Sequence, residues 1–135
     1  LRFTLHRAFD VCQDPYQALE EAVLLGIDTI LTSGQASCCA EGRGILKKLI
    51  AQADERIEIL VGGGVNDEVI RSMIEDVHAS SFHMSGKQII KSGMAYRKPC
   101  VNMGLPCFSE FDILRTDKKE IQKARCTIDE MLGEY

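Results

Sequence analysis

The sequence lacks any hydrophobic run of the length that a membrane-spanning helix needs. No apolar stretch approaches the roughly 18 residues of such a helix. A positively charged start followed by an apolar stretch and a small-residue cleavage site is also missing, so we see no signal peptide. The net charge is −4, and the lysines and arginines are scattered among acidic residues. These absences exclude a membrane protein, favour a cytoplasmic location and argue against binding to nucleic acid.

Several short motifs with a defined chemistry are absent as well. There is no GxGxxG fingerprint of a dinucleotide site and no Gly-Lys-Ser/Thr of a nucleotide-binding P-loop. The cysteines show no CxxC pair and no His/Cys spacing typical of zinc, and they lie at positions 12, 38, 39, 100, 107 and 126. Because this spacing is irregular and no secretion signal is present, we expect free thiols rather than disulfides.

What the sequence does contain is a strand followed by a helix, several times over. Alternating or continuous apolar segments predict strands at residues 2–6, 29–32, 57–61 and 81–84. Asp14 and Asn66 are good N-cap residues for helices after the first and third strands, and Gln17 completes a capping box with Asp14. Apolar residues at helical spacing predict a further helix around 45–53 and a last helix that opens near Asp117.

The part of the chain between residues 87 and 115 has a less regular pattern. Residues 101–103 and 111–114 are either short strands or packed extended segments. No low-complexity segment or linker divides the chain, so we expect residues 1–135 to form a single domain.

The spacing of the predicted strands indicates the fold class. They recur at roughly 25–30 residues, the repeat length of a βαβ unit, which predicts an α/β protein with a parallel sheet and right-handed crossovers. Four such units make either a small open sheet or half of a TIM (β/α)8 barrel. Gly62–Gly64 after the third strand and Ser85-Gly86 after the fourth favour the half-barrel, because the last loops of such barrels commonly hold phosphate.

The first predicted strand ends in a cluster of ionisable side chains, His6, Arg7 and Asp10. Ligands bind at the carboxyl ends of strands in parallel α/β proteins. In a functional interpretation, Arg7 binds an anion and His6 acts as an acid/base or hydrogen-bonding group. The structural alternative is an internal Arg7–Asp10 ion pair beside a hydrogen-bonded histidine.

His83, in the fourth predicted strand, shows the same alternation as His6. The two histidines could approach each other across a barrel interior. A lone histidine in a strand is more often a hydrogen-bonded core residue, and this alternative stays open. The candidate catalytic residues are therefore His6, Arg7, Asp10 and His83.

Glycine and hydroxyl residues follow the other predicted strands. The three consecutive glycines at 62–64 allow backbone amides to converge on an anion ahead of the helix that Asn66 caps. The alternative is steric necessity at a crowded rim. Thr32 and the Ser33-Gly34 turn are a weaker signal, for which a plain structural turn is at least as good an explanation. The candidate anion-binding residues are Arg7, Thr32, Ser33, Gly34, Gly62, Gly63, Gly64 and Ser85.

Two groups of sulfur-containing side chains are weak candidates for metal binding, because Cu(I) prefers soft donors. They are Cys38 with Cys39, and Cys100 with Met103 and Cys107. Adjacent cysteines rarely bind one metal comfortably, and buried or incidental thiols are the alternative for both groups.

Several of these segments, taken together, resemble the CutC-type copper homeostasis family. They stand in the order of the family and comprise residues 3–10, 31–34, 62–64, 82–83 and 92–94. The resemblance implies a TIM barrel, of which this chain would hold strands five to eight, and it implies copper as a ligand. The first four strands of the family have no counterpart here, and the start at Leu1 suggests truncation.

Three functions remain open at this point, and the residues do not decide whether the protein is an enzyme. The first is a cytosolic copper-homeostasis protein that handles Cu(I). The second is a TIM-barrel enzyme or binding protein for a small anionic or phosphorylated metabolite. The third is a truncated fragment without activity of its own. Because the exposed strand edges of a half-barrel are templates for pairing, we expect a homo-oligomer or completion by a missing N-terminal half.

Overall fold

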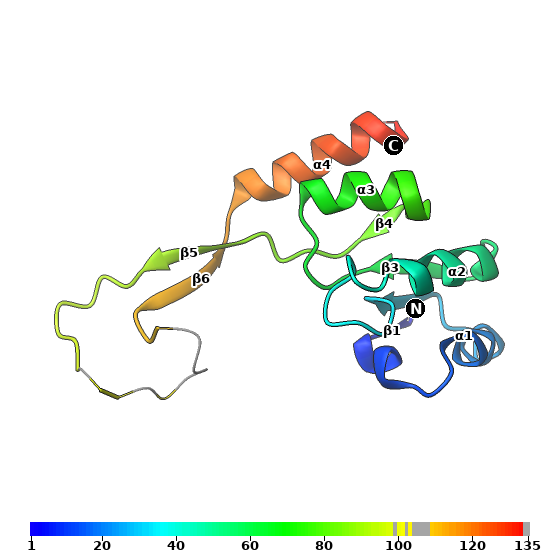
Figure 1. Ribbon diagram of the computed structural model, residues 1–135, viewed down its shortest axis with the longest axis horizontal. Helices are drawn as coiled ribbons and strands as arrows, with labels where there is room; N and C mark the ends of the chain where they lie inside the picture. The colour runs from blue at the N-terminus through cyan, green and yellow to red at the C-terminus, as the bar shows by residue number, and fades with distance from the viewer. Residues whose placement is uncertain (99, 102, 104–108, 134–135) are drawn as a thin grey trace.

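A four-stranded parallel sheet lies at the centre of the protein (Figure 1), in a computed structural model that describes residues 1–98, 100–101, 103 and 109–133. The strands follow one another in sequence order: β1 (Thr4–Leu5), β2 (Thr29–Thr32), β3 (Glu58–Val61) and β4 (Ser81–Phe82). The helices of this part are α1 (Pro15–Leu24), α2 (Arg43–Ala53), α3 (Asp67–Val77) and the C-terminal α4 (Lys118–Leu132). The predicted α/β class with a parallel sheet is therefore confirmed.

The helices gather on one side of this sheet. In Figure 1, α1, α2 and α3 succeed one another beside the strands, and α4 lies along α3. Ile30, Ile59 and Val61 are buried side chains of β2 and β3, and they belong to the main apolar core. The same core includes buried residues of the helices, among them Leu19, Leu46, Leu49 and Met73. A smaller core of Ile70, Ile74 and Ala124 joins α3 to α4. Right-handed crossovers between parallel strands place the helices in this way.

The opposite face of the sheet carries a polar cluster around Glu58. The Glu58 carboxylate accepts hydrogen bonds from Thr29 Oγ1 at 2.8 Å and Ser81 Oγ at 2.7 Å, and Arg2 Nη2 lies 3.3 Å away. The hydrogen bonds from Ser81 and Thr29, aided by the charge of Arg2, hold the pKa of Glu58 below its usual value. One carboxylate thus joins the first residues of β2, β3 and β4 on this face.

The predicted strands and helix starts are confirmed, although β1 and β4 are shorter than predicted. Asp14 Oδ1 accepts hydrogen bonds from the N–H groups of Tyr16 and Gln17, and Asn66 Oδ1 accepts one from Val69. Asp117 caps α4 in the same way. The reciprocal part of the predicted capping box is wrong, because Gln17 Nε2 donates to Glu21 instead.

An antiparallel hairpin occupies much of the stretch whose structure the sequence left open. Its strands are β5 (Lys87–Lys91) and β6 (Asp112–Thr116). The strand suggested at 111–114 is thus present and extends to Thr116, whereas Val101 and Met103 lie outside any strand and residue 102 is not described. β5 escaped prediction because its two isoleucines are adjacent, which gives no alternation, and its partner lies 20 residues further along the chain.

None of the helices in the described ranges combines the length and the apolar character needed to cross a membrane.

Two glycines near the start of α2 test how tightly the loop after β2 is packed. A Cβ on Gly42 would lie 1.9 Å from the Ser33 carbonyl oxygen, whereas one on Gly44 would meet nothing within 4 Å. Gly42→Ala should therefore lower the free energy of unfolding by about 1–3 kcal/mol through overpacking. Gly44→Ala should raise it by about 0.5–1 kcal/mol, because Gly44 lies inside a helix. Urea unfolding of both variants measures the contrast, and equal effects would contradict it.

Candidate functional site

The candidate site lies where β1, β2 and β3 end. A short 3-10 helix, η1 (Arg7–Val11), follows β1 and carries Arg7 and Asp10. Ser33 and Gly34 follow β2, and the three consecutive glycines follow β3. Parallel neighbours end at the same edge of a sheet, so these loops from distant parts of the chain meet at that edge.

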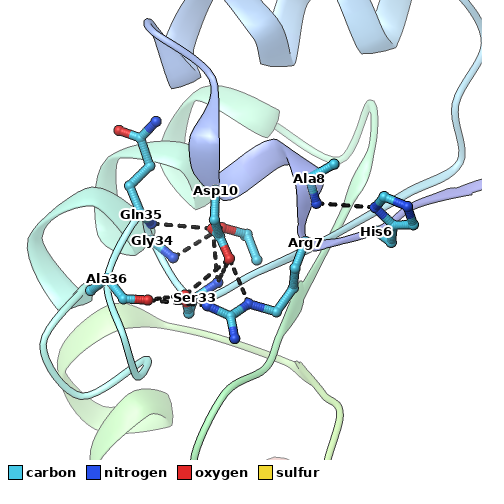
Figure 2. A network of polar contacts seen from close by, with 9 residues as sticks. His6, Arg7, Ala8, Asp10, Ser33, Gly34, Gln35 and Ala36 are labelled. Atoms are coloured by element: carbon cyan, nitrogen blue, oxygen red, sulfur yellow. Dashed lines mark hydrogen bonds and ion pairs between the residues drawn. The ribbon is translucent and has the colours of Figure 1, made fainter.

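The Asp10 carboxylate is the centre of this arrangement (Figure 2). Its Oδ1 accepts hydrogen bonds from Thr32 Oγ1 at 2.5 Å and from the N–H groups of Ser33 and Gln35 at 3.2 Å. Its Oδ2 accepts from Arg7 Nε at 2.7 Å and from Ser33 Oγ at 3.0 Å. Only 7% of the Asp10 side chain is exposed, so these donors replace water around a buried charge.

The charged form of Asp10 is favoured at this position. Burial raises the pKa of the carboxyl, but hydrogen bonds from Thr32, Arg7, Gln35 and Ser33 together outweigh it and bring the pKa below its usual value. Asp10 therefore holds its proton less readily than an ordinary carboxyl. That property suits a structural anion or a positioning group better than a general acid.

Arg7 is fixed on one side and open on the other. Beyond its bond to Asp10, its Nη2 donates to Ser33 Oγ at 2.6 Å and to the Ala36 carbonyl at 3.1 Å. Its Nη1 makes no hydrogen bond within the described residues, and it lies 3.4 Å from where a Cβ of Gly63 would stand. The internal Arg7–Asp10 ion pair of the structural interpretation is therefore present. One edge of the guanidinium nevertheless faces the glycine loop.

The glycine loop is shaped by close contacts and by positive φ angles. A Cβ on Gly62 would lie 2.6 Å from Leu31 Cδ1, and Gly63 and Gly64 have φ values of +91° and +77°. Steric necessity therefore accounts for these glycines, as the structural alternative held. The N–H groups of Gly63 and Gly64 also form no hydrogen bond with any described residue, so the loop retains backbone donors beside Arg7.

The two histidines do not join this cluster. His6 Nδ1 accepts a hydrogen bond from the Ala8 N–H at 3.0 Å, and Figure 2 shows its ring turned away from Arg7 and Asp10. His83 is exposed, and its Cβ lies 3.7 Å from where a Cβ of Gly62 would stand. Ser85 is exposed too, and its carbonyl accepts from Thr116 Oγ1 at 3.0 Å. Catalytic roles for His6 and His83 and an anion-binding role for Ser85 stay predictions.

Gln35 and Ala36 contribute contacts that the sequence did not indicate. Both act on the cluster through backbone groups: the N–H of Gln35 donates to Asp10, and the carbonyl of Ala36 accepts from Arg7. Gln35 has a φ of +58°, which turns the chain directly after Gly34. Because almost every residue type has a backbone N–H and a carbonyl, these contacts could not be predicted from the residue types. The Ser33-Gly34 turn was the only sequence signal for this loop.

The cysteines are free thiols at positions 12, 38, 39, 100 and 126, as predicted, while Cys107 lies outside the described residues. Cys39 is completely buried, and burial, reinforced by Cys38, raises the pKa of its thiol. Cys100 and Met103 are exposed. Among the residues that the structure describes, no three His, Cys, Asp or Glu side chains are placed to hold a metal ion together.

Comparison with known proteins shows which family this chain is similar to. Residues 1–88 match the model of the CutC family. A CutC family protein of Parabacteroides distasonis is 42% identical over 123 residues, which cover 90% of this chain and 51% of that protein. A human protein named copper homeostasis protein cutC homolog is 40% identical over 124 residues, 90% of this chain and 45% of its own. The chain thus spans about half the length of these relatives.

A solved structure agrees with the sequence matches. The crystal structure of the CutC protein of Streptococcus agalactiae superposes with a TM-score of 0.58 at 32% sequence identity, and the match covers 62% of this chain and 41% of that one. The similarity therefore extends from the sequence to the arrangement of strands and helices.

Replacing Asp10 by its neutral isostere tests the role of its charge. At pH 7, Asp10→Asn should lower the free energy of unfolding by about 1–3 kcal/mol, because buried donors lose a charged acceptor. The folded pKa of Asp10 is depressed, so its contribution is present above its unfolded pKa near 3.9 and is lost as the pH falls through the folded value. Urea unfolding between pH 7 and pH 3 should thus show the difference from the parent chain narrowing below about pH 4.

The exposed carboxylate of Glu41 provides the matched control. Glu41→Gln should leave stability nearly unchanged across the same pH range. An Asp10→Asn variant that is as stable as the parent chain at pH 7 would show that the carboxylate does not hold the loops together.

Proposed function

The chain belongs to the CutC family, and from this premise we propose that the protein takes part in copper homeostasis in the cytoplasm. The observation that carries the proposal is the match of residues 1–88 to the family model. Human and mouse relatives named copper homeostasis protein cutC homolog, 40% and 37% identical, support it.

We further propose that the four-stranded sheet is half of a TIM barrel, with residues 1–135 as one partial domain. Three features support this arrangement: the strands are parallel, they follow sequence order, and the helices lie on one side. The cluster around Glu58 lies on the other face, which is the side on which a barrel interior would lie. Four more strands would convert this face into a barrel interior.

For copper itself, we propose Cys100 and Met103 as the first Cu(I) ligands of this chain, ahead of Cys38 and Cys39. Cu(I) binds thiolate and thioether sulfur, and Cys100 and Met103 are both exposed. Cys39, by contrast, is buried and its raised pKa disfavours the thiolate that a metal needs. Cys107, which follows Met103 in the sequence, is the natural third candidate.

Titration of the reduced chain with Cu(I), in competition with a chromophoric Cu(I) chelator, tests this choice of ligands. The double variant Cys100→Ser/Met103→Leu should bind Cu(I) about tenfold or more weakly, a loss of about 1.4 kcal/mol or more. Cys38→Ser and Cys126→Ser, each of which also removes one thiol, should bind like the parent chain. Unchanged binding by the double variant would eliminate these ligands, and absence of binding by the parent chain would remove direct copper binding from the proposal.

A second candidate function is the binding of a small anion or phosphorylated metabolite at the rim of the sheet. The observation that favours it is the open Nη1 edge of Arg7, which faces the glycine loop and its unused N–H groups. A guanidinium edge and adjacent backbone amides are the donors that phosphate oxygens require. Thr32 and Ser33 donate to Asp10, which in turn holds Arg7, and Ser33 Oγ also accepts directly from Arg7 Nη2. The Gly34 N–H donates to Thr32 Oγ1 and so supports the same turn.

Thermal unfolding in inorganic phosphate, compared with sodium chloride of the same ionic strength, tests the anion site. A ligand at ten times its Kd stabilises a folded protein by about 1.4 kcal/mol, so the melting temperature should rise by a few degrees. The rise should disappear in Arg7→Gln. It should persist in Arg71→Gln, which removes an exposed arginine paired with Glu130 on the far helices. A parent chain that does not respond to phosphate would contradict an anion site here.

A further inference from the structure

The β5–β6 hairpin stands away from the rest of the protein. In Figure 1 it extends to one side, while the sheet and the helices lie together on the other. The described residues place it in a separate two-stranded sheet. A two-stranded hairpin by itself is marginally stable in water, and it needs either further strands with an apolar face or packing against a helix. In Figure 1 none of the described helices lies along this hairpin, so a further strand is the way in which it can be stabilised.

The hydrogen bonds of the hairpin determine which backbone groups point outward. Ser92 N–H donates to the Phe111 carbonyl at 2.7 Å, and Asp117 N–H donates to the Gly86 carbonyl at 2.8 Å. In an antiparallel pair, hydrogen-bonded and non-hydrogen-bonded residue pairs alternate. With the observed register, the outward backbone groups of β6 belong to Asp112, Leu114 and Thr116. Those of β5 belong to Lys87, Ile89 and Lys91.

The β5 edge is unsuited to pairing with itself. If two copies met antiparallel about the central Ile89, Lys87 of each copy would lie directly opposite Lys91 of the other. Like charges directly opposite each other on paired strands are destabilising. Lysines on an edge strand are also a common way of preventing edge-to-edge association. This edge is therefore protected.

The β6 edge, in contrast, is self-complementary. A two-fold axis at Leu114 places Asp112 opposite Thr116 of the second copy, and Ile113 opposite Arg115 of the second copy. No like charges meet. Leu114 would exchange N–H···O bonds with Leu114 of the second copy. The Thr116 N–H would donate to the Asp112 carbonyl across the axis, which leaves undisturbed the Asp112 N–H that already donates to Ser109.

The same pairing also covers apolar surface. Ile89 and Leu114 are paired residues on one face of the hairpin, and they are 56% and 44% exposed. Across the two-fold axis they would join their counterparts in one continuous apolar row over four strands. Side chains in register across neighbouring strands stabilise a sheet. The row would thus supply the apolar face that the isolated hairpin lacks.

We propose that two copies of this chain associate through their β6 strands, antiparallel about Leu114, to form a four-stranded sheet. The outer strands of this sheet are the two β5 strands, whose lysines stop further addition. The association therefore closes at a dimer rather than growing into a filament. The proposal does not rest on copper or anion binding.

Sedimentation equilibrium and light scattering of the full 135-residue chain test the proposal. The parent chain should have twice the mass of 15.0 kDa that one chain has. Ile113→Glu and Ile113→Lys form a matched pair, because both replace the same exposed apolar side chain, whose partner inside the hairpin is the uncharged Ile90, but they place opposite charges beside Arg115 of the second copy. The dimer Kd of Ile113→Glu should be lower than that of Ile113→Lys, by about 2- to 30-fold or more through two symmetric contacts.

Two further variants separate this edge from other surfaces. Leu114→Lys places like charges on the axis and should yield a monomer. Ile89→Lys removes a similar apolar side chain from the outer strand and should weaken the dimer less. Circular dichroism checks that each variant is folded, and the Ile113 pair decides the outcome if Leu114→Lys does not fold. A monomeric parent chain would overturn the proposal. So would a dimer whose Kd is the same in the two Ile113 variants, as expected for a dimer joined through the open face of the parallel sheet.

Discussion

A single buried carboxylate holds the carboxyl ends of the strands in one arrangement. Asp10 accepts hydrogen bonds from Thr32, Ser33 and Gln35, and so it ties the loop after β1 to the loop after β2. It also orients Arg7, whose guanidinium then lies against Gly63 in the loop after β3. The pKa of Asp10 is lowered because the surrounding hydrogen-bond donors stabilise its charged form. Any ligand at this rim meets a surface that this carboxylate has shaped.

The part of the fold that could be predicted is the part built from local signals. Caps such as Asp14 and Asn66 act within one helical turn, and so they can be read from a short stretch of sequence. The β5–β6 hairpin depends on pairing across 20 intervening residues, which no local pattern encodes. At the site, the Arg7–Asp10 pair was foreseeable from their spacing, but the Gln35 amide was not, because every residue except proline has an N–H group.

The functional and structural interpretations of the rim turn out to be compatible. The Arg7–Asp10 ion pair is internal, and the glycines avoid real clashes, yet one edge of Arg7 and the amides of Gly63 and Gly64 still lack partners among the described residues. Among the sulfur-containing residues, Cys39 is buried, whereas Cys100 and Met103 are exposed. The proposed copper ligands and the proposed anion site lie in different parts of this chain.

The buried thiol of Cys39 makes the packing of this rim accessible to kinetics. Its N–H group donates to the Gly63 carbonyl at 2.9 Å, and its side chain has no exposed surface. An alkylating reagent reaches exposed Cys126 directly, but it reaches Cys39 only when the loops after β2 and β3 separate. The labelling rate of Cys39 relative to that of Cys126 therefore reports how often the rim opens. The protein thus carries a built-in chemical probe for this local opening.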